Sequence, residues 1–216
     1  MTAVRTPSAP ARFDLAAFAA TPLVAAPFDC LVVENFLDRA GLAAARADFP
    51  EITRAGLFPL SELRYGPAFA GLVDEIRSPG VTRGFSEKFG IDLSGHPIMI
   101  TVRGRCQEKD GRIHTDTETK VVTALLYLNE AWDRSGGRLR LLRGPDDIED
   151  KIAEVPPNGG TLIAFRRADN SYHGHERYAG VRRYVMFNWM TSQAALTREL
   201  ARHRLSARIK RRVPFL

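Results

Sequence analysis

The sequence predicts a mainly β protein with flanking helices, in which the C-terminal part forms an antiparallel sandwich or barrel. From residue 96 onward, short apolar runs alternate with Gly, Pro, Asn and Asp, which is the pattern of several short strands joined by turns. Before that point, apolar residues recur at helical spacing. We therefore expect an α+β domain whose N-terminal helices pack against the outside of a β core.

Length and composition are those of one globular domain. The chain has 216 residues, 44% of them hydrophobic, which is enough for a real core. It holds no apolar run long enough to span a bilayer, and residues 1–12 lack an apolar signal region, so we expect a disordered leader and no membrane partner. Cys30 and Cys106 do not form a disulfide framework, which agrees with a reducing compartment. These features predict a cytoplasmic protein.

The net charge of +6 comes from 31 basic and 25 acidic residues. Much of the excess lies in residues 191–216, a predicted basic helix and tail that carries Arg198, Arg202, Arg204, Arg208, Lys210, Arg211 and Arg212. A solvated helix face is the simpler interpretation, because binding of a polyanion usually needs a continuous basic surface. Nucleic acid stays an alternative partner, and a basic surface on the pocket side of the molecule would favour it.

The first elements after the leader are a strand and a helix. Residues 28–36 are apolar with a β-branched centre, which predicts a strand. Asp38 follows as an N-cap, and a helix is expected over 39–48. Residues 51–65 give a weak signal and are predicted to be a loop.

Two further helices are expected before the β core. Residues 67–77 carry apolar side chains at helical spacing. Ser78 is a predicted N-cap with a proline directly after it, and Gly90 is a predicted C-terminal residue of that last helix. Residues 13–95 are thus expected to supply one strand and supporting helices, and no part of the chemistry.

Residues 96–190 are predicted to form the β core. Its strands are expected at 96–103, 120–128, 139–142, 160–165 and 184–189. Asp110 and Gly111 mark a turn between the first two.

Two histidines and an aspartate in this core have the composition of a metal site. His114 and Asp116 lie two residues apart, so in extended backbone their side chains point the same way. Two imidazoles and one carboxylate form a facial triad, which holds non-haem Fe(II) and leaves three coordination positions open. The second imidazole can come from His173 or His175, which also lie two residues apart.

Three segments around this motif resemble the 2-oxoglutarate- and Fe(II)-dependent dioxygenases, in particular the prolyl-hydroxylase-like branch. Residues 124–133 resemble its Tyr-Leu-Asn and Trp segment, residues 135–141 its Gly-Gly-x-Leu strand, and residues 157–165 its Pro-x-x-Gly-x-Leu-x-x-Phe strand. The resemblance covers about the C-terminal half of the chain. It implies a double-stranded β-helix, or jelly roll, for the core.

The resemblance also implies an activity. The metal ligands would be His114, Asp116 and His173, because the spacing to the later arginine and tryptophan favours His173 over His175. The cofactors would be Fe(II), 2-oxoglutarate as cosubstrate and O₂, with ascorbate as a reductant. The reaction would hydroxylate an unactivated C–H bond of a peptidyl residue or a small metabolite and release succinate and CO₂.

An arginine is expected to bind the far carboxylate of the cosubstrate, because a guanidinium donates two parallel hydrogen bonds. In the resembled branch it lies six positions before the tryptophan of the last strand, and counting back from Trp189 gives Arg183. Arg182 is the alternative. Side chains alternate along a strand, so Arg183 shares a face with Val185, Phe187 and Trp189. That apolar face is expected to be the interior one.

Other pocket residues follow from the same reasoning. Tyr127 is expected to be a second donor to the far carboxylate, with Thr123 on the same strand face and Trp189 as a wall. Candidate substrate-binding residues are Arg103, Arg105 and His175. A nucleic-acid-modifying oxygenase and a non-catalytic jelly-roll binding module are the alternative functions. The sequence leaves the substrate and the oligomeric state open.

Overall fold

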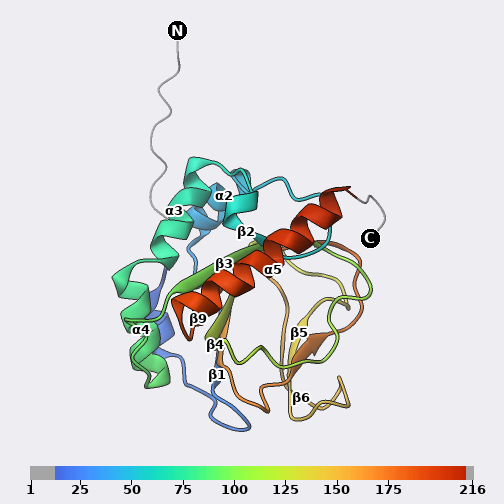
Figure 1. The fold of residues 1–216 in the computed structure, drawn as a ribbon. Coiled ribbons are helices and arrows are strands. Elements are labelled where there is room, and N and C mark those ends of the chain that lie inside the picture. The colour runs from blue at the N-terminus through green and yellow to red at the C-terminus, as the bar shows by residue number, and fades with distance from the viewer. Residues whose placement is uncertain (1–12, 213–216) are drawn as a thin grey trace.

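Two antiparallel β-sheets form the centre of the computed structural model, which describes residues 13–212, with side chains as far as Ala207 (Figure 1). The larger sheet has the order β1-β7-β4-β9-β3-β2. Its strands are β1 (Cys30–Val33), β2 (Phe58–Pro59), β3 (Ile98–Cys106), β4 (Lys120–Tyr127), β7 (Leu162–Arg166) and β9 (Gly180–Met190). The smaller sheet, in the order β6-β5-β8, consists of β5 (Leu139–Leu142), β6 (Lys151–Val155) and β8 (His173–His175).

The two sheets pack face to face. One buried apolar cluster joins Leu125 and Met186 of the larger sheet to Leu141 and Val155 of the smaller one. Side chains from both inner faces therefore fill the space between the sheets, as in a jelly roll.

Helices cover the outer face of the larger sheet, as Figure 1 shows for α3 and α4. The helices are α1 (Leu15–Ala20), α2 (Arg39–Ala47), α3 (Pro67–Ile76), α4 (Pro79–Phe89) and α5 (Gln193–Arg212), with a 3₁₀ turn η1 (Leu60–Glu62). Phe85 of α4 lies with its ring centroid 4.6 Å from that of Trp189 and 4.5 Å from that of Phe18. The expected α+β class with flanking helices is confirmed. In the described part of the chain, no helix is both long and apolar enough to cross a bilayer.

The predicted helix ends are confirmed. Asp38 caps α2, with its side chain accepting a hydrogen bond of 2.6 Å from the backbone nitrogen of Gly41. Ser78 caps α4 in the same way, through Val81. Gly90 ends α4 at φ 63°, a left-handed conformation that other residues adopt at a cost.

Replacing Asp38 with Ala is expected to lower the free energy of unfolding by about 1 kcal/mol, because the cap of α2 is lost. Urea denaturation followed by circular dichroism measures this. Asp74→Ala is the matched control, since Asp74 is an exposed carboxylate inside α3. An equal loss in both variants would contradict a capping role for Asp38.

Several elements differ from the expectation. β2 and η1 lie within residues 51–65, which we expected to be a loop, and α1, β6 and β8 were not predicted. β8 is only three residues long and β6 is half-exposed for most of its length, so neither carries a strong apolar pattern. β9 begins at Gly180, four residues before the expected start. The expected leader, residues 1–12, lies outside the described residues.

Candidate active site

The three predicted metal ligands meet at one end of the barrel. His114 forms an isolated bridge with His173, the first residue of β8, through hydrogen bonds of 3.0 and 2.9 Å between their backbones. Asp116 follows two residues later, and one potential ligand atom from each of the three side chains lies within 4.8 Å of the others. Among the described residues this is the only such group of three or more metal-binding side chains.

Both imidazoles are oriented with Nε2 available to a metal. Nδ1 of His114 lies 2.8 Å from the carbonyl oxygen of Arg112, and Nδ1 of His173 lies 3.0 Å from that of Ser171. A carbonyl oxygen can only accept, so each Nδ1 carries the proton and each Nε2 keeps its lone pair. Burial lowers the pKa of His173 to about 4, against the opposing effect of Asp116, and so keeps this ring neutral at physiological pH. Neutral imidazoles are what a divalent metal requires.

The carboxylate of Asp116 is held through both oxygens. Lys120 Nζ donates to Oδ1 at 2.6 Å and Thr123 Oγ1 donates to Oδ2 at 2.5 Å, while Asn188 Nδ2 donates to Thr123 Oγ1 at 2.8 Å. Burial disfavours the charged form of Asp116, but Lys120, His173 and these hydrogen bonds outweigh it and hold its pKa well below the usual range. The group is therefore an anion with a fixed orientation.

Replacing Thr123 with Val is expected to weaken metal binding by about 10- to 100-fold, because partners of a metal ligand typically contribute that much. Competition of the protein with a coloured chelator for Ni(II) measures the affinity. Thr123→Ser keeps the hydroxyl and should bind the metal as the parent protein does. An unchanged affinity in the valine variant would show that Asp116 needs no orientation from this side chain.

A buried arginine, Arg182, lines the cavity that also contains the three predicted metal ligands. Arg182 is 1% exposed, donates from Nε to the carbonyl oxygen of Gly137 at 2.7 Å and from Nη2 to Tyr127 Oη at 3.3 Å, and lies over the ring of Tyr184. No carboxylate of the described residues forms an ion pair with it. Burial raises the pKa of Tyr127 to about 12, so this phenol stays a hydrogen-bond donor. A buried cation without a protein anion is costly unless a ligand supplies the negative charge.

The expectation that Arg183 faces the interior is wrong, and so is the expectation that Trp189 forms a pocket wall. Val185, Phe187 and Trp189 pack against the helices. Arg182, Tyr184 and Met186 alternate with them along β9 and line the cavity that contains the three predicted metal ligands. The guanidinium of Arg183 lies over the ring of Phe49. Both faces of the larger sheet are buried, so an apolar face does not identify the interior of the barrel.

We call the cavity that is lined by His114, Asp116, His173 and Arg182 the metal cavity. Its volume is about 310 Å³. Three of the other expected residues line it, namely Arg103, Thr123 and His175, and Tyr127 lies behind Arg182. Arg105 is exposed and does not line this cavity.

Sequence reasoning missed several residues that line the metal cavity, and the charged or titratable ones among them are Lys120, Arg202 and His203. Lys120 has a detectable signal, because it lies four residues after a predicted ligand. Arg202 and His203 come from α5, which contacts β2, β3 and β9 and runs diagonally across the front of the molecule in Figure 1. The sequence pattern of a basic helix does not predict which of its turns reaches the cavity.

The sequence of the core matches a known family. Residues 104–191 match the model of the 2OG-Fe(II) oxygenase superfamily. That segment includes His114, Asp116, His173 and Arg182. No curated protein matches this sequence.

Three solved structures illustrate the similarity of the fold. A prolyl-4-hydroxylase from Pseudomonas putida has a TM-score of 0.53 at 19% identity, over 86% of this chain and 98% of that one. HygX from Streptomyces hygroscopicus, with nickel and 2-oxoglutarate bound, has a TM-score of 0.52 at 14% identity, over 74% and 81%. The viral collagen prolyl hydroxylase vCPH from Paramecium Bursaria Chlorella virus-1, as its 2OG complex, has a TM-score of 0.50 at 14% identity, over 76% and 95%.

At these identities the likeness shows the shared jelly-roll fold. Together with the family match over residues 104–191, it confirms the expected resemblance to prolyl-4-hydroxylase-like 2OG-Fe(II) oxygenases.

Proposed function

We propose that the protein is an Fe(II)- and 2-oxoglutarate-dependent dioxygenase that hydroxylates an unactivated C–H bond of a peptidyl residue or a small metabolite. In the overall reaction, the substrate C–H group, 2-oxoglutarate and O₂ become a C–OH group, succinate and CO₂. The observation that carries the proposal is the pairing, in one cavity, of the His114, Asp116 and His173 donors with the buried guanidinium of Arg182.

The donor set fits ferrous iron. Two neutral imidazoles presenting Nε2 and one oriented carboxylate are the ligands of a facial triad, and three coordination positions stay open for cosubstrate and O₂. Bound iron would supply the oxygen chemistry. The protein's part is to keep Asp116 ionised through Lys120 and Thr123 and to keep His173 neutral through burial.

In this proposal Arg182 would bind the far carboxylate of 2-oxoglutarate, and Tyr127, which contacts Arg182, would be the second donor. Gly137 occupies Nε of Arg182, which leaves N–H groups on the two terminal nitrogens for a carboxylate. Tyr127 Oη accepts from Arg182 and keeps its own proton to donate. Leu125, Leu139 and Met186 line the same cavity and limit the water near this pair.

Succinate release by the purified protein tests this proposal. The protein is incubated with Fe(II), 2-oxoglutarate and O₂, with ascorbate to keep the iron reduced. We expect succinate formation that stops when oxygen is removed or when a chelator is added, and that rises when a substrate is present. Absence of succinate from a folded, iron-loaded protein would contradict the proposed reaction.

A further inference from the structure

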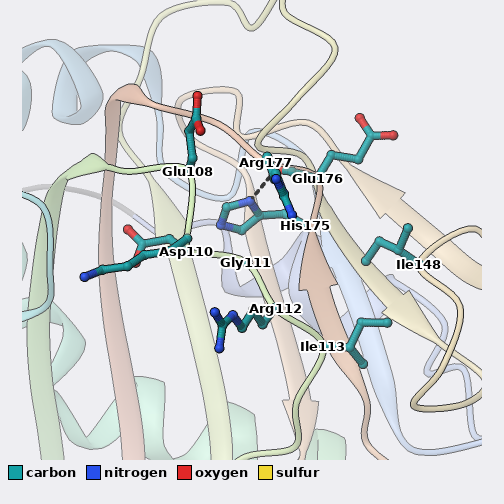
Figure 2. Close-up of a pocket in the computed structure, with 10 residues that line it drawn as sticks. Glu108, Asp110, Gly111, Arg112, Ile113, Ile148, His175, Glu176 and Arg177 are labelled. Carbon is teal, nitrogen blue, oxygen red and sulfur yellow. Dashed lines mark hydrogen bonds between the residues drawn. The ribbon is translucent and has the colours of Figure 1, made fainter.

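A second and larger cavity adjoins the metal cavity. It has a volume of about 560 Å³ and is drawn in Figure 2; we call it the outer groove. Its walls come from residues 108–113, after β3, from residues 176 and 177, after β8, and from Ile148. Gly111 and His175 line both cavities, so the two cavities meet at these residues.

The loop can approach His175 closely at this junction because position 111 is a glycine. The carbonyl oxygen of Gly111 accepts from the backbone nitrogen of His175 at 2.9 Å, which holds the loop against β8. Gly111 has φ +90°, and a Cβ atom there would lie 2.4 Å from Nδ1 of His175. A side chain at this position would therefore displace the His175 ring, which lines both cavities.

The outer groove carries unpaired positive charge. Of its acidic residues, Asp110 pairs with Arg103 at 2.5 Å. Glu176 pairs at 3.0 Å with Arg140, which also pairs with Glu149 and Glu154. The cations Lys109, Arg112 and Arg177 form no ion pair with any described residue, and Glu108 is the one remaining acid. Figure 2 shows Arg112 and Arg177 on two sides of His175. The groove therefore favours an anionic ligand.

The lining favours an acidic peptide over a nucleic acid. Ile113 and Ile148 offer apolar contacts to an aliphatic side chain, and no Phe, Tyr or Trp of the described residues lines the groove for a base to stack on. Glu108 would also repel a phosphodiester backbone. The metal cavity, at about 310 Å³, has to hold 2-oxoglutarate together with the group that reacts, so the rest of an extended substrate must lie outside it.

We propose that the outer groove binds an acidic segment of a peptide substrate, whose target residue passes His175 into the metal cavity. This inference rests on the proposed oxygenase function. The acidic side chains would contact Arg112 and Arg177, and an aliphatic neighbour would contact Ile113 and Ile148.

Selection from random peptides tests the proposal without a known substrate. The immobilised protein, loaded with Ni(II) and 2-oxoglutarate, is incubated with a pool of short N-acetylated random peptides at physiological ionic strength, and the retained peptides are sequenced by mass spectrometry. We expect enrichment of Asp and Glu over the input pool. In Arg112→Gln/Arg177→Gln this enrichment should fall about three- to tenfold, as expected for the loss of two exposed ion pairs. The substitution at residue 112 leaves intact its carbonyl oxygen, which His114 contacts.

Arg77→Gln/Arg83→Gln is the matched control, since these two exposed arginines on the helical side also form no ion pair with any described residue. It should retain the parent enrichment, which separates groove binding from the general positive charge of the protein. No enrichment, or an enrichment that does not depend on Arg112 and Arg177, would overturn the proposal. Retention of a random single-stranded oligonucleotide with the same dependence would overturn it in favour of nucleic acid. Binding of 2-oxoglutarate is measured on every sample, so that failure of the oxygenase site is recognised separately.

Discussion

Replacement of His114, Asp116 or His173 by Ala is expected to abolish Fe(II)-dependent turnover of 2-oxoglutarate. These side chains supply the three donors of the site, and no other described residue offers a fourth ligand within the group. The loss should exceed about 100-fold, because removal of a mere partner of a metal ligand already costs up to that amount. Succinate release and bound iron should fall together in each variant.

His175→Ala is the control for these three variants. His175 lies two residues after His173 and lines the same cavity, but its Nδ1 contacts the carbonyl oxygen of Glu176 and it does not belong to the ligand group. We expect it to keep its iron and a substantial part of the 2-oxoglutarate turnover measured without substrate. If His175→Ala loses iron while His173→Ala keeps it, the third ligand is wrongly assigned.

Arg182→Met should strongly raise the concentration of 2-oxoglutarate required for binding. Removing one partner of a buried charge pair costs about 2–5 kcal/mol, which corresponds to roughly 30- to 4,000-fold in the dissociation constant. Folding should survive, because methionine at a fully buried position needs no anion. Titration of the metal-loaded protein with 2-oxoglutarate gives the dissociation constant directly.

Arg183→Met removes the same charge from the neighbouring position and serves as the matched control. Its side chain lies over Phe49, on the other face of β9. We expect little change in 2-oxoglutarate affinity. A large effect at Arg183 with none at Arg182 would mean that Arg183, and not Arg182, points into the metal cavity.

The cluster of His114, Asp116 and His173 could be predicted from the sequence, whereas the side of β9 that faces this cluster could not. A His-x-Asp pair is local, so side-chain alternation alone brings two ligands together. The interior face of β9 depends instead on how this strand pairs with β4, where Tyr127 lies opposite Tyr184. Residues directly opposite each other share a face, so Tyr184, and with it Arg182, lies on the same side as Tyr127. That register is a long-range property, which apolar patterning cannot supply when both faces of a sheet are buried.

The fold shows the same division between local and long-range information. Capping residues such as Asp38 and Gly90 mark helix ends through contacts within a few residues, and these predictions are confirmed. β8, by contrast, consists of His173, Gly174 and His175, and it is a strand only because β5 pairs with it. The position of Arg202 at the cavity likewise depends on where α5 packs.

The central claim is that the metal ligands and Arg182 form a single site for a metal ion and 2-oxoglutarate. Anaerobic titration calorimetry with 2-oxoglutarate tests it most directly, using the parent protein with metal, the parent protein after chelation, and metal-loaded Arg182→Met. We predict one 2-oxoglutarate bound per chain in the first sample and much weaker binding in the other two, because each lacks one of the two anchors of the ligand. Binding that is equally tight before and after chelation would contradict the claim.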